Sequence, residues 1–195
     1  MNGFNEIEFY NICKKFNAEP KMKEVSVGYD EDTYFNKVKK AVNTDRRGEV
    51  VFCVKRPNGK YIAITCEEYP KGVFRIPTGG LGHSEDIVEA VYRETREELG
   101  LEVEIVKFAG VVKIRFVHRK EEINFFSYLF ILKEKSGRLL EDASDDEVSE
   151  VREVDVGGLE EIALSLNRIE GEWSDWGKFR YITTNEIYQI LKEEA

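Results

Sequence analysis

The chain has 195 residues, of which 42% are hydrophobic and 34% are charged, and its formal net charge at pH 7 is −9. This length predicts one domain with an appendage, and the acidic charge argues against general affinity for nucleic-acid backbone, which needs clustered cations. No apolar run is long enough for a membrane span, no secretory signal opens the chain and three scattered cysteines fit a reducing compartment, so we expect a cytoplasmic protein.

Residues 1–46 are predicted to form a helical N-terminal extension, because Tyr34, Val38 and Val42 recur at helical spacing in its second half. Strands alternating with helices after it favour an α/β layered domain over residues 47–195. In chain order, the pattern predicts helices over 5–16 and 31–42, strands over 48–55, 60–66 and 73–76, a glycine-rich loop and a helix after it, strands over 102–118 and 122–132, an acidic loop over 137–146, a strand over 148–154, and helices over 158–166 and 184–192 with Thr184 as a cap.

The densest pattern lies in residues 79–101, where the glycine-rich run GGLGHSE is followed by the helical run RETREELGL. At about 100° per residue, Glu94, Glu97 and Glu98 fall on one side of that helix, at the edge of its apolar stripe. Ser84 suits the N-cap and Gly100 suits the stop. Carboxylates this close need a cation, and a hard divalent ion takes oxygen ligands. A solvated helix with ion pairs between successive turns is the competing interpretation.

This pattern resembles the signature of the Nudix hydrolases: Gly, five residues, Glu, seven residues, then Arg-Glu-U-x-Glu-Glu-x-Gly-U, where U is a bulky apolar residue. Every specified position matches except the first U, which is Thr95. The resemblance covers residues 79–101, and a weaker likeness runs from about 48 to 162. It implies a Nudix-type α/β/α sandwich with a mixed sheet, carrying the helical extension of residues 1–46 on a Nudix hydrolase domain of residues 47–195.

The resemblance also implies site roles and a cofactor, Mg²⁺ or Mn²⁺. Arg93 would hold the glutamates by salt bridges, and Glu85 would brace the loop. Glu98 is one candidate general base, and Glu147 in the acidic loop is a second, although a solvated loop charge explains Glu147 equally well. The implied metal ligands are the Gly79 carbonyl and the side chains of Glu94, Glu97 and Glu98.

Substrate recognition needs groups outside the signature. Arg75, at the lip of the glycine-rich run, is a candidate for binding phosphate. Lys113 and Arg115 share one face of a predicted strand and either grip phosphates or form an exposed basic stripe. The aromatic residues near the C-terminus favour packing of the closing helix, or a dimer interface, over stacking on a nucleobase; they are Trp173, Trp176, Phe179 and Tyr181.

These features favour metal-dependent hydrolysis of a pyrophosphate linkage in a small nucleoside diphosphate derivative, with release of a nucleoside monophosphate. A nucleotide sugar such as ADP-ribose and a dinucleoside polyphosphate both fit. Two alternatives stay open: a ligand-sensing Nudix-like regulator without catalysis, and an RNA 5′-pyrophosphohydrolase, which residues 76–80 resemble weakly. Sensors of this kind usually lose metal-binding glutamates, and this chain keeps them. We expect residues 1–46 to cover the core or to join two subunits, with a homodimer favoured.

Overall fold

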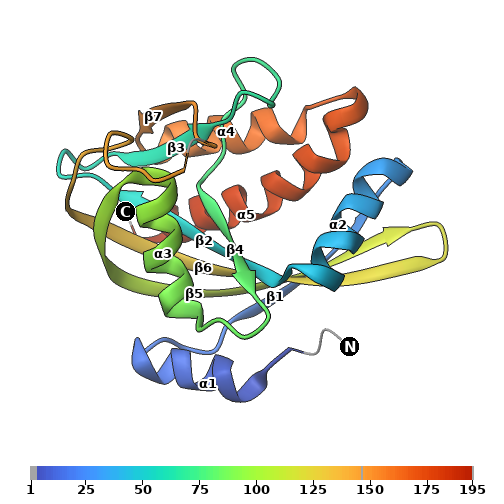
Figure 1. Ribbon diagram of the computed structural model, residues 1–195, viewed down its shortest axis with the longest axis horizontal. Coiled ribbons are helices and arrows are strands. Elements are labelled where there is room, and N and C mark those ends of the chain that lie inside the picture. The colour runs from blue at the N-terminus through green and yellow to red at the C-terminus, as the bar shows by residue number, and fades with distance from the viewer. Residues whose placement is uncertain (1–3, 146, 195) are drawn as a thin grey trace.

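A seven-stranded mixed sheet forms the centre of the computed structural model, which describes residues 4–145 and 147–194 (Figure 1). The strand order is β1-β5-β6-β2-β3-β7, and β4 pairs with β2 beside β3. The strands are β1 (Met22–Gly28), β2 (Arg46–Lys55), β3 (Tyr61–Thr65), β4 (Thr78–Gly82), β5 (Leu101–His118), β6 (Glu121–Gly137) and β7 (Glu150–Val154). The helices are α1 (Glu6–Lys15), α2 (Asp32–Thr44), α3 (Ile87–Leu99), α4 (Val156–Asn167) and α5 (Ser174–Glu193), with a short 3₁₀ turn over Gly171–Trp173.

Helices cover both faces of this sheet, which confirms the α/β/α sandwich. The central strand β2 is apolar and buried on both sides, as expected for a strand between two helical layers. Val50 and Phe52 pack in the core formed with α1 and α3, whereas Val51 and Cys53 pack in the core formed with α2 and α5. Alternation along one strand therefore supplies both cores.

The sequence missed two strands, β1 and β4, and misplaced the start of one helix. Residues 22–28 form β1, which pairs in parallel with β5, and most of its side chains are exposed. Residues 73–76 make only an isolated bridge, between Ile64 and Arg75. The closing helix begins at Ser174, so Thr184 lies inside it, buried, and the prediction that Thr184 caps a helix was wrong. Trp176 and Phe179 are buried in that helix, which is the packing role favoured for them.

Residues 4–46 pack against the core, as expected for a cover. Ile12 of α1 is buried in one core and Phe35 of α2 in the other. The buried Asp175 of α5 accepts hydrogen bonds from the backbone N–H groups of Asp30 (2.9 Å) and Glu31 (3.0 Å), which fixes the start of α2. Within residues 4–145 and 147–194, no helix is long and apolar enough to cross a membrane.

Candidate active site

The glycine-rich run begins as the strand β4, and a loop follows it only from residue 83. A side chain at Gly79 has no room there, because its Cβ would lie 2.1 Å from Cγ of Glu94. The helix α3 is capped by Asp86, whose side chain accepts from the N–H groups of Val88 (2.9 Å) and Glu89 (3.1 Å). The prediction that Ser84 is the N-cap was therefore wrong. Gly100 ends α3 in the left-handed conformation, with φ of 69°, as predicted.

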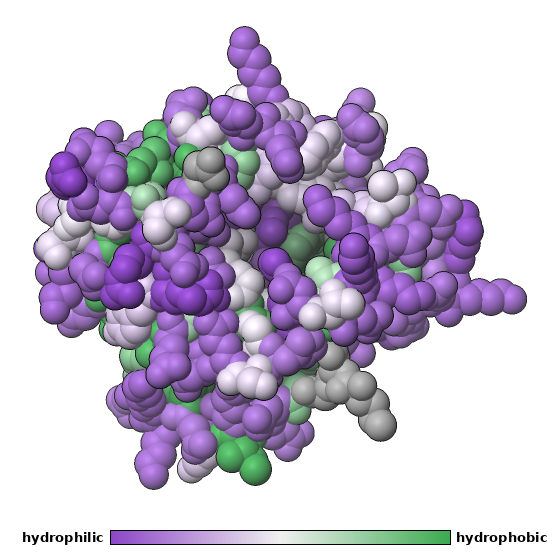
Figure 2. Space-filling model, in the orientation of Figure 1, coloured by the Kyte–Doolittle hydropathy of each residue, from purple (hydrophilic) through white to green (hydrophobic). Residues whose placement is uncertain are grey.

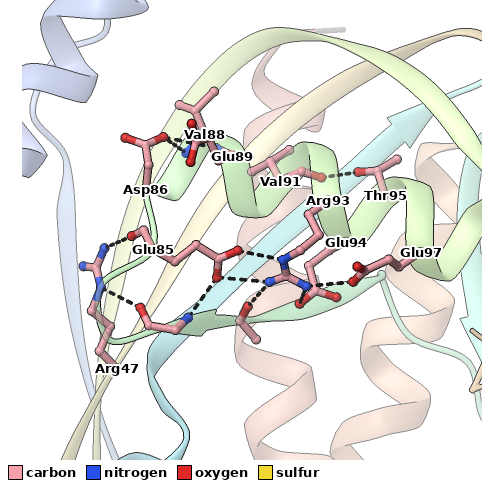
Figure 3. Close-up of polar contacts among 12 residues, drawn as sticks. Arg47, Glu85, Asp86, Val88, Glu89, Val91, Arg93, Glu94, Thr95 and Glu97 are labelled. Atoms are coloured by element: carbon pink, nitrogen blue, oxygen red, sulfur yellow. Dashed lines mark hydrogen bonds and ion pairs between the residues drawn. The ribbon is translucent and has the colours of Figure 1, made fainter.

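Arg93 lies at the centre of a network that joins α3 to the preceding loop (Figure 3). Its Nη1 donates to Oε1 of Glu94 and to Oε2 of Glu97, both at 2.8 Å. Its Nε and Nη2 donate to Glu85 at 2.7 and 3.0 Å, and Nη2 also donates to the Gly80 carbonyl at 3.0 Å. The hydrogen bond from Arg93 lowers the pKa of Glu85. This one guanidinium therefore sets the position of three carboxylates.

Glu98 lies deeper than the rest of the cluster and is only 5% exposed. Its Oε2 is buried and has no hydrogen-bond partner in the part of the chain that the structure describes. Burial raises the pKa of Glu98 to about 8; Arg75 opposes this rise, whereas Glu94 and the acidic loop reinforce it. Burial also raises the pKa of Glu94. The site thus holds two buried carboxylates with a high cost of ionisation.

The acidic loop after β6 folds back onto the end of α3. The Glu97 carbonyl accepts from the N–H groups of Ser144 (3.1 Å) and Asp145 (3.2 Å). Asp145 and Glu147 both act on the pKa of Glu98, so the loop brings acidic groups to the buried carboxylate. Glu147 itself is exposed, and its N–H donates to the side chain of Asp145.

The three predicted phosphate-binding residues lie in different surroundings. Arg75 is buried beside Glu98, and it donates to the Tyr69 hydroxyl (2.8 Å), the Ile76 carbonyl (3.0 Å) and the Thr78 hydroxyl (3.1 Å). It is thus held by protein groups and acts on the cluster by its charge.

Lys113 and Arg115 lie on β5, which β6 and β2 separate from β4. Lys113 pairs with Glu24 at 3.1 Å, and Arg115 pairs with Glu122 at 3.7 Å. The structure does not bring these two cations to the carboxylates. Their positions agree with the alternative interpretation, a basic stripe at the surface, in which Arg115 is exposed and Lys113 is partly exposed.

The carboxylate cluster fits a hard divalent cation in its donor atoms. Within the described ranges, no three Asp, Glu, His or Cys side chains are already grouped around one point as metal ligands. Arg93 uses one oxygen of Glu94 and one of Glu97, while Oε2 of Glu98 has no hydrogen-bond partner among residues 4–145 and 147–194. A buried carboxylate oxygen without a hydrogen bond calls for a proton or a cation, and an all-oxygen donor set is what Mg²⁺ and Mn²⁺ take.

Comparison with known proteins identifies the family. Residues 40–177 match the model of the NUDIX domain. The structure is similar to those of an ADP-ribose pyrophosphatase from Streptococcus suis (12% identity, TM-score 0.46, covering 75% of this chain and 92% of that one) and a NUDIX hydrolase from Nitrosomonas europaea (16%, 0.47, 69% and 86%). It is also similar to that of a UDP-X diphosphatase (11%, 0.52, 85% and 74%). No curated protein matches the chain in sequence. Because the domain model spans most of the chain, the protein belongs to the Nudix hydrolase family.

Proposed function

We propose that this hydrolase requires Mg²⁺ or Mn²⁺ and cleaves the pyrophosphate linkage of a small nucleoside diphosphate derivative, releasing a nucleoside monophosphate. The observation that carries the proposal is the environment of Glu98. A buried carboxylate with an unpaired oxygen, beside a second buried carboxylate and an acidic loop, is costly for the fold. Such a cost is usual at catalytic and metal-binding sites.

The residues that would hold the cation are Gly79, through its carbonyl, and the side chains of Glu94, Glu97 and Glu98. A bound divalent cation would neutralise charge on the phosphates and lower the pKa of a bound water. Arg93 keeps Glu94 and Glu97 aimed at the same region, and Glu85 holds Arg93 in turn. The close approach of Glu94 explains why residue 79 is glycine, since a Cβ there would lie 2.1 Å from Cγ of Glu94.

Two carboxylates are candidates for moving the proton. Glu98 holds a proton on its buried carboxyl near neutral pH in the metal-free site, because burial raises its pKa to about 8. Glu147 lies on the loop beside it, and its side chain is exposed to solvent. Comparing the pH profiles of Glu98→Gln and Glu147→Gln separates the two roles, since only loss of the base removes the limb of the profile that it causes.

The charge distribution supports a short substrate over long RNA. The net charge is −9, and the cations of the β5 stripe are already paired with Glu24 and Glu122. Long RNA would bring many phosphates toward an acidic surface, whereas a short conjugate needs only the cluster and its cation.

A hydrolysis screen in Mg²⁺ tests the proposal, with nucleoside triphosphates, ADP-ribose, a dinucleoside polyphosphate and 5′-triphosphate RNA as substrates. We expect the conjugates to be cut fastest, with EDTA abolishing turnover and Glu97→Gln or Glu98→Gln lowering it by about two orders of magnitude or more. The exposed Glu104→Gln is the matched control. RNA cut fastest by a wide margin would contradict the substrate class, and tight binding without hydrolysis of any substrate would favour the sensor.

We also propose a homodimer, supported by two large apolar side chains left exposed on α1, Ile7 (75%) and Tyr10 (64%). Packing them against a second copy would remove apolar area from water. Light scattering on the full chain tests this, and a monomer at assay concentrations would reject the dimer without affecting the hydrolase proposal.

A further inference from the structure

The strand β1 forms one border of the sheet (Figure 1). It pairs with β5 on one side, and no strand of residues 4–145 or 147–194 lies on its other side. It has seven residues, whereas β7 at the opposite border has five. An edge strand presents a row of unpaired N–H and C=O groups, which another strand can pair with. The free side of β1 is therefore a candidate interaction surface.

The hydrogen bonds at the two ends of β1 show which of its residues face this free side. The N–H of Val111 donates to the Lys21 carbonyl at 3.0 Å, and the N–H of Tyr29 donates to the Val117 carbonyl at 2.8 Å. The register between β1 and β5 runs without a shift over residues 22–28. In a parallel ladder, residues that bond to the neighbouring strand alternate with residues that face away from it. The odd-numbered residues of β1 therefore bond to β5, and the even-numbered ones turn their N–H and C=O groups outward.

Exposed apolar surface lies beside this edge. Met22 of β1 is 37% exposed and lines a groove together with Glu24 and with Tyr10 of α1, which is 64% exposed. Figure 2 shows apolar side chains at the lower border of the molecule, where Figure 1 places α1. On the other face of the sheet, Val25 packs only partly buried beside the core formed with α2 and α5. The apolar surface of α1 thus continues to the free edge of β1.

The charges along the edge complement a second copy of the same strand. The side chain of Glu24 is 67% exposed, and its carboxylate lies 3.1 Å from Nζ of Lys113 on β5. The next outward-facing residue, Ser26, lies beside Arg115 of β5, whose Nε is 3.4 Å from its hydroxyl. The Arg115 guanidinium is 3.7 Å from the carboxylate of Glu122, which is a loose ion pair. A cation therefore stands behind Ser26, where the strand itself offers no carboxylate.

We propose that two copies of the chain pair in antiparallel fashion along β1, with a twofold axis at Val25, so that their sheets become one continuous sheet. In this register, Glu24 of each copy lies opposite Ser26 of the other. All outward-facing residues of β1 then find partners, which adds about eight hydrogen bonds. Because neighbouring strands are about 4.8 Å apart, Glu24 of one copy reaches past Ser26 to Arg115 of the other, and the twofold axis makes this contact twice.

The sequence of β1 favours this register over its neighbours. An axis one residue earlier would place Glu24 opposite Glu24 of the second copy, and like charges directly opposite each other are unfavourable. An axis one residue later would place Met22 opposite Asp30, which lies beyond the strand and whose N–H already donates to Asp175. This interface defines the contact surface of the homodimer proposed above, and it rests on that proposal for the identity of its occupant.

Sedimentation of the full chain over a range of concentrations, without substrate, tests the interface. Ser26→Pro removes an outward N–H, and proline is tolerated in an edge strand only where its N–H side faces solvent. The twofold axis doubles the loss, so we expect the dissociation constant of the dimer to rise about tenfold or more. Ser26→Ala, which keeps the N–H, is the matched control and should stay within about twofold of the wild type.

Charge reversal gives a second test that leaves the backbone of β1 unchanged. Glu24→Arg and Arg115→Glu should each weaken the dimer about five- to tenfold, because each places like charges together across the axis. The two changes in one chain restore opposite charges and should recover most of the affinity. Glu104→Arg changes the net charge as much as Glu24→Arg does, at an exposed position far along β5, and should leave the dimer unchanged.

Amide hydrogen exchange of the unmodified protein supplies a readout without any variant. The N–H groups of Glu24 and Ser26 should exchange slowly only at concentrations where the dimer forms. The N–H of Val25, which bonds to β5, should be protected at every concentration.

The outcomes separate the β1 interface from the other proposals. A chain that stays monomeric, or exchange at Glu24 and Ser26 that does not depend on concentration, overturns it. A dimer that survives Ser26→Pro and both charge reversals, but is lost when Ile7 and Tyr10 are changed to serine, also overturns it and places the contact on α1. No substrate enters these measurements, so the hydrolysis screen tests the catalytic proposal separately.

Discussion

The carboxyl of Glu98 is buried, and its ionisation costs stability. Burial raises its pKa from 4.5 to about 8, so between these values the folded state holds a proton that the unfolded state has lost. Stability from this group is therefore fully present below the unfolded pKa and declines as pH rises through the folded one. In Glu98→Gln the side chain is neutral at every pH. We expect this variant, in EDTA at pH 8.5, to be more stable than the wild type by on the order of a few kcal/mol. In Mg²⁺ we expect it to have lost most of its turnover.

Urea unfolding at pH 5 and pH 8.5 measures this difference. The two proteins should be close in stability at the lower pH and diverge at the higher one. The exposed Glu104→Gln should track the wild type at both. A Glu98→Gln variant that is less stable than the wild type at pH 8.5 would contradict the burial argument.

Gly79 is fixed by its neighbour across β4. A Cβ at this position would meet Cγ and Cδ of Glu94 at 2.1 and 2.2 Å, so Gly79→Ala must push Glu94 out of its place in the cluster. We expect turnover to fall about 100-fold, since displacements near 1 Å have this effect on aligned groups. Gly28→Ala is the control, because no atom lies within 4 Å of its added Cβ. Comparable activity in the two variants would show that Glu94 is free to move.

At the scale of elements, two residues, Asp86 and Ser84, are candidates for the N-cap of α3. Asp86 accepts from two N–H groups of the first turn, whereas Ser84 lies in the preceding turn and is exposed. Asp86→Ala should cost about 1 kcal/mol in the free energy of unfolding, and Ser84→Ala should cost a few tenths at most. Thermal or urea unfolding measures both, and the reverse order would restore Ser84 as the cap.

A histidine joins the ends of three elements. His118, the last residue of β5, lies with Nδ1 2.8 Å from the Tyr29 carbonyl and Nε2 2.8 Å from Oδ1 of Asp32, at the start of α2. Both partners accept, so both ring nitrogens donate and the imidazolium form is favoured. The hydrogen bond to Tyr29, then the one to Asp32, raises the pKa of His118.

Because the folded pKa of His118 is raised, its contribution is fully present below the unfolded pKa and is lost as pH rises through the folded value. The stability gap between wild type and His118→Asn should therefore be larger at pH 5.5 than at pH 9. Urea unfolding at the two pH values measures it. His83→Asn, an exposed histidine in the loop before α3, should show no such gap. A difference in stability between wild type and His118→Asn that is larger at pH 9 than at pH 5.5 would contradict the assignment of the charged imidazolium to His118.

Elements whose pattern lies within one short segment could be predicted from the sequence, whereas elements that depend on contacts between distant segments could not. The helix α3 and its carboxylates depend on spacing within one element, and the sequence predicted them. The strand β1 is held by its pairing with β5. Because most of its side chains are exposed, its sequence has no clear alternation of apolar and polar residues from which a strand could be predicted. The early start of α5 was missed because its first turns show no simple apolar stripe. Trp176 and Phe179 pack in two different hydrophobic clusters of the fold.

At the scale of the whole molecule, the site depends on contacts that no local pattern contains. The Arg93 network could be expected because its members are close in sequence. The neighbours of Glu98 come from separate segments, since Arg75 lies before β4 and Glu147 lies after β6, and only the fold brings them to the buried carboxyl.

Arg47 connects helix α1 to the turn between β4 and α3. It donates to both carboxylate oxygens of Glu8 on α1, each at 2.7 Å. It also donates to the carbonyls of Gly82 (3.2 Å) and Glu85 (2.8 Å), and Figure 3 shows its contact with Glu85. The turn between β4 and α3 is thus held partly by a helix from the extension. Because Glu85 in turn positions Arg93, a change in α1 should reach the carboxylates through this chain of contacts.

We therefore expect Glu8→Gln to lower kcat about three- to tenfold and stability by about 1–2 kcal/mol, since one paired charge is removed and Arg47 loses its two-pronged partner. Glu6→Gln is the matched control, an exposed glutamate two residues earlier on α1 that should behave as the wild type. Steady-state kinetics and urea unfolding give the two quantities on the same preparations. If Glu8→Gln loses stability with kcat unchanged, α1 serves only to cover the sheet; if kcat falls as expected, the added helix is part of how this enzyme aligns its catalytic loop.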